Sequence, residues 1–229
     1  MKIEIPFNGP AYKSESVLLS AQECINFYPR PYPELGQDKL ALFGTPGLEH
    51  WLTPGIAGEV RGDIQYGEYL YVIVSNTFYK IDIAKNVTIV DTILTASGMV
   101  GMDTNGLDIL IVDGANGYVY DLTAGTLTQI VDPDFPGGNN VIQVDGYYLV
   151  NKPGTGQIWR SDFNDGLNWD GLAFSTAGGD SDNIISLLTD HRDVWIIGEY
   201  STEIWYNTGA ATFNFARIEG AFIENGSMS

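Results

Sequence analysis

The feature that most constrains the fold is a repeat of about 40 residues. Each copy has a polar turn followed by a short apolar run, as in QYGEYLYVIVS, NGLDILIVDG, VDGYYLVNK and DHRDVWIIGE. The turn glycines Gly67, Gly106 and Gly146 lie 39 and then 40 positions apart, and the matching turn at Arg192 comes 46 positions later. Short runs of β-branched and aromatic residues bounded by Gly, Asn and Asp predict strands. The spacing therefore predicts four copies of one small sheet.

Each repeat holds further strand-like runs before and after this element, which predicts four strands per unit. The units span 60–93, 99–131, 141–176 and 184–218. Four strands with a period near 40 are typical of a β-propeller blade. A sandwich of two sheets is the alternative, but it does not explain the repeat. We predict an all-β fold, a β-propeller-like array of four-stranded antiparallel blades, because stacked blades bury each other's faces.

The two ends of the chain depart from this pattern. Residues 1–55 are rich in Pro and Gly and predict an extended N-terminal arm, whereas residues 56–229 hold the blades. A strand over Lys39–Phe43 could complete a last blade, and the residues after 218 begin as a further unit would, which leaves the array incomplete. We expect the arm to reach a neighbouring subunit or partner through its aromatic residues. These candidate interface residues are Phe7, Tyr12, Phe27, Tyr28 and Tyr32.

The charge balance limits the possible partners. The chain has 229 residues with 29 acids and 11 bases, which gives a net charge of -18. Gripping nucleic acid needs clustered Lys and Arg, and docking on anionic lipid has the same requirement. The single cysteine, Cys24, rules out a disulfide within the chain. The acids predict either a solvated surface or a surface that repels a polyanion.

Residues 162–169 form the most suggestive polar loop. Asp162, Asn164 and Asp165 precede Gly166, but the spacing is one residue short of an EF-hand calcium loop and no flanking helices are predicted. One cysteine and two distant histidines do not make a zinc site. We therefore expect no metal and no cofactor.

Signals for catalysis are weak. Asp190-His191-Arg192-Asp193 contains the HRD triplet of kinases without the accompanying motifs, which predicts a polar hairpin turn. A glycosidase pair of carboxylates stays open as an alternative, although the five arginines are scattered. Tryptophans could stack on sugars, but Trp159 and Trp205 recur at matching places in successive units, which favours packing between blades. We expect no catalytic residue.

Two stretches of the chain resemble a known family. The phrase SAQECINFYPRPYPELGQDKLALFGTPGLEHW carries the elements from Ser20 to Pro29 and from Thr45 to Gly47, and the later blade QVDGYYLVNKPGTGQIWRSDFNDGLNWDG agrees as well. They are similar to the packaged-DNA stabilisation proteins of short-tailed bacteriophages, also called tail nozzle or head-closure hub proteins.

The resemblance implies a structural protein of the virion tail and not an enzyme. Such proteins form a ring, typically a hexamer, below the portal and its adaptor, and are assembled in the host cytoplasm. The ring retains the packaged genome, extends the DNA ejection channel and holds the tail needle or fibre and the tailspikes, with no membrane involved. An acidic lumen would let DNA pass without specific binding. The alternatives are a glycan- or receptor-binding propeller and, third, a glycan-degrading enzyme.

In a propeller, the loop at 162–169 is better interpreted as a structural turn than as a binding site. Asp162-x-Asn164-x-Gly166-x-x-Trp169 resembles a degraded Asp-box, the turn between the third and fourth strands of sialidase-type blades. In that motif the acid accepts N–H groups of the turn, the Gly adopts a positive φ and the Trp packs between strands. We predict a structural clasp at these four residues.

Overall fold

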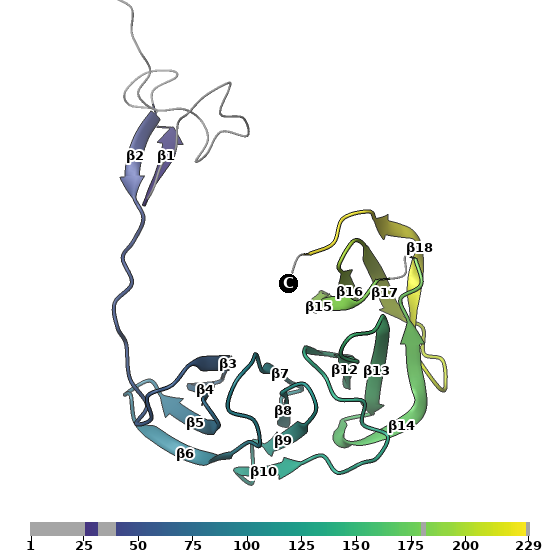
Figure 1. Ribbon diagram of the computed structural model, residues 1–229, viewed down its shortest axis with the longest axis horizontal. Helices are drawn as coiled ribbons and strands as arrows, with labels where there is room; N and C mark the ends of the chain where they lie inside the picture. The colour runs from purple at the N-terminus through teal and green to yellow at the C-terminus, as the bar shows by residue number, and fades with distance from the viewer. Residues whose placement is uncertain (1–25, 32–39, 180–181, 228–229) are drawn as a thin grey trace, which may run out of the picture. The chain divides into compact units, whose positions relative to one another are not determined.

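The computed structural model describes residues 26–31, 40–179 and 182–227, and every regular element in them is a β-strand. The chain divides into two compact units, Met1–Trp51 and Leu52–Ser229. The second unit holds four four-stranded antiparallel sheets, each a meander in which successive strands pair (Figure 1). The predicted fold class is thus confirmed. We call the sheets blades 1 to 4 in chain order.

The strands of the blades have the following bounds. Blade 1 contains β3 (Val60–Tyr66), β4 (Tyr69–Val74), β5 (Thr77–Asp82) and β6 (Val87–Thr92). Blade 2 contains β7 (Gly101–Thr104), β8 (Asp108–Val112), β9 (Gly117–Asp121) and β10 (Thr126–Gln129). Blade 3 contains β11 (Val141–Val144), β12 (Tyr147–Asn151), β13 (Gln157–Asp162) and β14 (Asp165–Thr176). Blade 4 contains β15 (Ile184–Asp190), β16 (Asp193–Gly198), β17 (Thr202–Asn207) and β18 (Phe215–Ile223).

The turn between the first two strands of each blade explains the repeated glycines. Gly67, Gly106 and Gly146 have φ values of 60°, 89° and 82°, and His191 takes the same left-handed conformation at 58°. Glycine adopts this region without steric cost, because it has no Cβ. The fourth copy of the turn therefore centres on His191, one residue before the Arg192 that the sequence spacing selected. Polar hairpin turns are confirmed at all four places.

The blades follow one another around an arc, with their first strands innermost (Figure 1). The innermost strands β3 and β7, β7 and β11, and β11 and β15 are in contact. Each strand alternates its side chains between two faces, so that one face meets the preceding blade and the other meets the next. In blades 1 to 3 the second strands are the most apolar, because side chains on both of their faces are buried.

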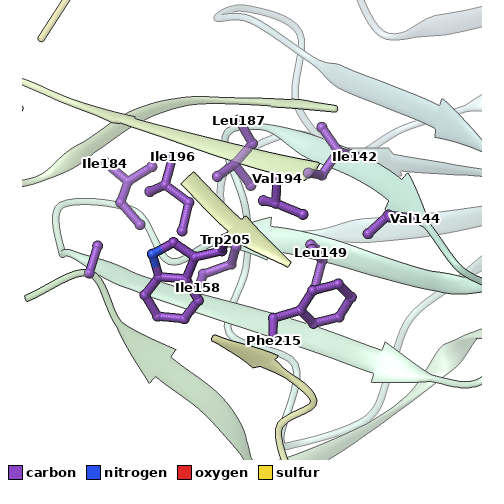
Figure 2. Packing of buried hydrophobic residues seen from close by; sticks show 11 residues of the cluster. Ile142, Val144, Leu149, Ile158, Ile184, Leu187, Val194, Ile196, Trp205 and Phe215 are labelled. Carbon is purple, nitrogen blue, oxygen red and sulfur yellow. The ribbon is translucent and has the colours of Figure 1, made fainter. Parts of the chain in front are cut away.

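Three apolar cores fill the junctions between blades. Tyr71 and Phe78 of blade 1 meet Tyr118 and Tyr120 of blade 2. Leu110 and Val112 of blade 2 belong to the same cluster as Tyr148, Trp159 and Trp169 of blade 3. The core between blades 3 and 4 is shown in Figure 2. Its buried members are Ile142, Val144, Leu149, Ile158, Ala177, Ile184, Leu187, Val194, Ile196, Trp205 and Phe215.

Two tryptophans repeat the same local arrangement in successive blades. The indole of Trp159 donates to Gln157 Oε1 at 3.2 Å, and the indole of Trp205 donates to Glu203 Oε2 at 2.7 Å. Both rings are more than nine-tenths buried in the cores between blades. The prediction that these tryptophans pack between blades is confirmed, and their rings are not available to stack on a sugar.

At both ends of the array the strand pairing differs from the expected pattern, while the incompleteness of the array stays a prediction. The strand predicted over Lys39–Phe43 is observed as β2 (Leu40–Gly44), and it pairs with β1 (Phe27–Pro31) in a separate two-stranded sheet. Residues 219–223 do not begin a new unit, because they continue β18, where Phe222 pairs with Glu203 and Ile223 with Thr202. A positive φ of 80° at Gly220 and an irregularity in the register let this strand continue.

Candidate functional site: a clasp between blades and the charged surface

The loop at 162–169 lies where blade 3 meets blade 2. β13 and β14 are joined by a tight hairpin in which Asn164 has a φ of 52° and its N–H donates to Gly146 O at 2.7 Å. Gly166 is not among the residues with positive φ. Asn tolerates the left-handed region better than most residues, so Asn164 takes the conformation that the Asp-box comparison assigned to the glycine.

The Asp-box comparison predicted that Asp162 accepts the N–H groups of this loop, but other carboxylates do so. Asp162 lies 3.9 Å from the guanidinium of Arg160, and its side chain is 57% exposed. The turn N–H groups bind other acids, since Asp165 accepts from Leu167 N at 2.9 Å. Asp132 in turn accepts from Trp169 N at 2.9 Å. The clasp thus reaches from blade 3 to the segment that follows blade 2.

Gly166 and Trp169 make the tight contacts of the clasp. A Cβ built at Gly166 would lie 3.0 Å from Val119 Cγ2 of blade 2, so a larger side chain would require Val119 to shift by a few tenths of an ångström. The ring of Trp169 is 5% exposed and meets Phe135 edge-on at 5.1 Å. Its indole N–H donates to Gly166 O at 2.9 Å. Sequence reasoning missed Asp132, because it lies 37 residues away from Trp169.

A buried polar group joins the same two blades at another point. The Tyr148 hydroxyl lies 2.5 Å from Asp108 Oδ1 and accepts from Asn105 N at 3.2 Å. Burial raises the pKa of Asp108, and the hydrogen bond from Tyr148 opposes part of that rise. Nearby, Asp103 Oδ2 accepts from Gln143 N at 2.6 Å, and burial raises the pKa of Asp103 as well. These groups fasten adjacent blades through a carboxylate and a backbone N–H or a hydroxyl.

The HRD triplet lies in the turn between β15 and β16, as predicted. Arg192 donates from Nε and Nη2 to the two oxygens of Asp145, at 2.8 and 2.9 Å. This bidentate pair holds the pKa of Asp145 below its usual range, chiefly through the hydrogen bonds from Arg192. The side chain of His191 is 93% exposed. The triplet therefore links blade 4 to blade 3 at the surface.

Several basic side chains are already engaged. Arg61 is 5% exposed and donates to the carbonyl oxygens of Ser75, Thr95, Ser97 and Gly98. Arg160 is 8% exposed and donates to Thr212 O. The ammonium of Lys80 lies 3.9 Å from the centroid of the Tyr69 ring. With Arg192 paired as well, these four cations do not form a basic patch that could hold a phosphate chain.

The part of the chain that the structure describes carries side chains of the types that bind metal ions. Its His, Cys, Asp and Glu side chains form no group of three or more that could hold a metal ion. Its hollows include one of about 700 Å³ at the edge of blade 4 and one of about 400 Å³ between blades 1 and 2. None of the described residues belongs to a helix long and apolar enough to span a membrane.

The candidate interface residues of the arm lie only partly within the described residues. Phe7, Tyr12 and Tyr32 lie outside them. Phe27 and Tyr28 lie on β1, where they are 48% and 41% exposed, and Tyr28 stacks on Phe43 with the ring centroids 5.9 Å apart. The structure thus brings two of the five onto one small sheet.

Comparison with known proteins identifies the class of this chain. The model of the phage stabilisation family, described as bacteriophage P22 Gp10, beta-propeller, matches residues 1–229. The chain therefore belongs to this family, as the sequence resemblance indicated. Membership supports a structural role in stabilising packaged phage DNA and makes the chain a component of the virion. Among curated proteins, none matches the chain.

Solved structures with a similar fold are distant in sequence. YCF48 bound to D1 peptide has a TM-score of 0.53 at 16% identity, covering 81% of this chain and 59% of its own. YCF48 from Cyanidioschyzon merolae has 0.52 at 12%, covering 80% and 64%. A chain of the mitotic checkpoint complex has 0.53 at 14%, covering 72% and 53%. The chain therefore spans somewhat more than half of these propellers, and at such identity the likeness concerns the fold alone.

Proposed function

We propose that this chain is a nozzle-type tail subunit that forms a ring below the portal and its adaptor, retains packaged DNA and extends the ejection channel. The observation that carries the proposal is the match of the phage stabilisation family to all 229 residues. Its partners in this proposal are further copies of the chain, the portal and adaptor, and the needle or fibre and tailspike proteins.

The charge of the chain is compatible with a channel that does not bind the DNA passing through it. The net charge of -18 repels duplex DNA, which carries about one charge per 1.7 Å of axis. Arg61 and Arg160 are buried, and Arg192 is held by Asp145. A channel wall with free cations would bind DNA and slow its passage. We propose that the wall facing DNA is acidic for this reason.

The junctions between blades suit a part that bears load. Packed DNA presses on whatever closes the head, so a subunit in that position needs stiff contacts between its blades. The hydrogen bond from Trp169 N to Asp132 and the pairing of Tyr148 with Asp108 each join neighbouring blades at a buried aromatic residue.

The test compares filled phage heads assembled with and without this chain. Heads lacking the chain should lose DNA to added nuclease, and supplying the purified chain should restore protection. Purified chain should show no measurable retardation of duplex DNA in a gel at physiological salt. Heads that keep their DNA fully protected without the chain would contradict the proposal, and tight binding of free duplex would contradict the acidic wall.

A further inference from the structure

A hollow of about 400 Å³ opens between blades 1 and 2, beside the hairpins that join their third and fourth strands. Its lining includes charged, amide, aromatic and apolar side chains: Tyr69, Lys80, Asp82, Asn86, Ile89 and Tyr120. Ligand pockets have volumes of roughly 300–1,000 Å³ and place a few polar groups among apolar ones. The structure describes every residue of blades 1 and 2, so the walls of this hollow do not depend on either end of the chain.

A lysine beside an aromatic ring is the main charged feature of the hollow. Lys80 Nζ lies 3.9 Å from the centroid of the Tyr69 ring, and this contact leaves its N–H groups able to donate to an acceptor. Two residues later, Asp82 accepts from Asn86 Nδ2 at 2.7 Å and from Asn86 N at 2.9 Å. These hydrogen bonds, first the one from the Asn86 side chain, hold the pKa of Asp82 below its usual range. The hollow therefore carries one cation and one anion.

The same set of side chains recurs in blade 3. Lys80 pairs with the third residue of β4, and Arg160 pairs with the third residue of β12. Tyr147 begins β12 as Tyr69 begins β4, and the guanidinium carbon of Arg160 lies 5.0 Å from the centroid of the Tyr147 ring. Asp162, two residues after Arg160, lies 3.9 Å from the guanidinium. The two blades thus present the same combination of a ring, a cation and a carboxylate.

In blade 3 this combination is covered by a loop of the next blade. Arg160 donates from Nε to Thr212 O at 2.9 Å and from Nη2 to Thr212 O at 2.5 Å and to Ala211 O at 3.4 Å. Both acceptors belong to residues 208–214, which join β17 to β18. Arg160 is 8% exposed in this arrangement. The molecule itself therefore shows what fits over the combination, namely a loop whose backbone carbonyls meet the cation.

Blade 2 does not supply such a loop to blade 1. Its matching connection, between β9 and β10, is residues 122–125 and so is shorter than residues 208–214. The N–H of Gly125 donates to Asp121 O at 2.8 Å, which closes this turn. Within the described residues, the contacts of the Lys80 ammonium are to the rings of Tyr69 and Tyr71. The hollow lies where a longer connection would meet Lys80.

We propose that the hollow between blades 1 and 2 binds a loop of a partner protein, whose backbone carbonyls accept hydrogen bonds from Lys80 as residues 208–214 accept them from Arg160. The balance of Lys80 and Asp82 suits an uncharged loop, because an anion would meet Asp82 and a cation would meet Lys80. The loop 208–214 has this chemistry, since its sequence TGAATFN is uncharged and its side chains are mostly small. The inference goes beyond the proposed function, because it assigns a surface and a recognition chemistry that do not depend on the ring.

The probe for this site is a peptide with the sequence of residues 207–215, NTGAATFNF, closed into a ring by a disulfide between added terminal cysteines. Asn207 pairs with Phe215 in blade 4, so joining the ends keeps the loop conformation and reduces the entropy lost on binding. Titration of the full chain is followed by the backbone amide NMR shifts. Shifts at Lys80 and Gly125 should change and saturate at peptide concentrations on the order of 1 mM.

Two substitutions of Lys80 and one matched control test the contact. Lys80→Met should weaken peptide binding roughly tenfold or more, because it removes hydrogen bonds from a charged donor. Lys80→Arg should retain binding, because a guanidinium makes the matching contact in blade 3. Lys152→Met is the control and should bind as the parent does, because Lys152 also lies beside a ring, 5.7 Å from the centroid of Trp159, but away from the hollow.

Three results would overturn the inference. The first is peptide that leaves the shifts at the hollow unchanged, and the second is equal binding by the parent and Lys80→Met. The third is a response of the Lys80 shifts to inorganic phosphate or to glucose, titrated separately, without a response to the peptide; that result would identify an anion site or a sugar site. None of these titrations uses phage heads, so their outcome is separate from that of the nuclease test.

Discussion

The two end faces of the blade array differ in how their apolar side chains are covered. On blade 1 the outward residues Val72, Val74, Tyr79 and Ile81 are 5% exposed or less, and Leu52 of the entering segment packs on them. On blade 4 the face turned away from blade 3 has no such cover from the residues that the structure describes, and Leu188 and Tyr206 on it are 51% and 44% exposed; we call it the open face. Both faces show the same alternation of apolar residues. The alternation therefore predicts that a face is buried, but it does not identify the segment that covers it.

The largest expected effect contrasts two tryptophans. Trp169 lies in a closed junction and is 5% exposed, whereas Trp195 lies on the open face. Trp169→Ala should cost about 3–5 kcal/mol of unfolding free energy, because it leaves a cavity and removes the clasp. Trp195→Ala should cost less than about 1 kcal/mol in the monomer. Urea unfolding at high dilution measures both, and equal losses would show that the open face is covered within the monomer.

Replacing one isoleucine on each end face should change the free energy of unfolding by different amounts. Ile81 is 2% exposed under the cover of blade 1, and Ile204 is partly exposed on blade 4. Ile81→Ala should cost about 2–5 kcal/mol and Ile204→Ala less than about 1 kcal/mol. Thermal unfolding of the two variants side by side decides between them. A small cost at Ile81 would mean that the entering segment does not seal that face.

Two tyrosines give a smaller but more specific contrast. Tyr79 and Tyr118 occupy matching positions in the third strands of blades 1 and 2. Each lies three residues before an aspartate, Asp82 or Asp121, and that aspartate pairs with the first residue of the second strand. The hydroxyl of Tyr118 accepts from Leu94 N in the preceding connection at 2.9 Å. The hydroxyl of Tyr79 is buried without a hydrogen-bond partner. An end blade thus lacks a contact that an internal blade has.

Replacing each of these tyrosines with phenylalanine should change the free energy of unfolding in different directions. Tyr118→Phe should lose about 1–3 kcal/mol, because it leaves Leu94 N without its acceptor. Tyr79→Phe should be neutral or stabilising, because it removes a buried hydroxyl that has no partner. Chemical denaturation of both variants tests this. A clear loss in Tyr79→Phe would indicate a hydrogen bond at that hydroxyl.

The smallest effect concerns pH. Asp108 lies in the junction of blades 2 and 3 and its pKa is raised by burial, whereas the pKa of Asp145 in the surface turn is lowered by Arg192. The contribution of Asp108 to stability is full below its unfolded pKa, near 4, and is lost as pH rises through the raised folded value. That of Asp145 is present above the unfolded pKa and is lost as pH falls through the lowered folded value.

Asparagine at each position should therefore change the pH profile in opposite ways. Asp108→Asn should raise the melting temperature at pH 7 relative to the parent, with the gain disappearing toward pH 3. Asp145→Asn should lower it at pH 7, and the difference should shrink only as pH falls below the unfolded pKa, near 4, toward the lowered folded pKa. Melting curves between pH 3 and 7 measure both, and profiles that shift in the same direction would contradict the assignment.

Local patterns in the sequence were sufficient to predict the blades. Turn glycines and short apolar runs act over a few residues, so the fold class and the hairpins around Gly67, Gly106 and Gly146 could be predicted. The clasp at 162–169 was predicted less well. Its position fits, but its acceptors are Asp132 and Asp165 and its positive φ belongs to Asn164. Asp132 comes from another blade connection, and no local signal in the sequence points to it.

The open face of blade 4 could not be found from sequence either. Leu188 and Trp195 have the same polarity as the buried pair Ile142 and Leu149, so the pattern predicts burial for both pairs. Only the arrangement of the blades shows which pair has a neighbour. The β1–β2 pairing was missed for a related reason, because Lys39–Phe43 has strand character but does not specify its partner.

The most direct measurement is an electron cryo-microscopy map of the intact phage particle at a resolution that shows side chains. The proposed function predicts a ring of this chain below the portal and adaptor, with an acidic wall toward the DNA. A chain absent from the tail would contradict the proposed function, and a basic wall toward the DNA would contradict the acidic channel.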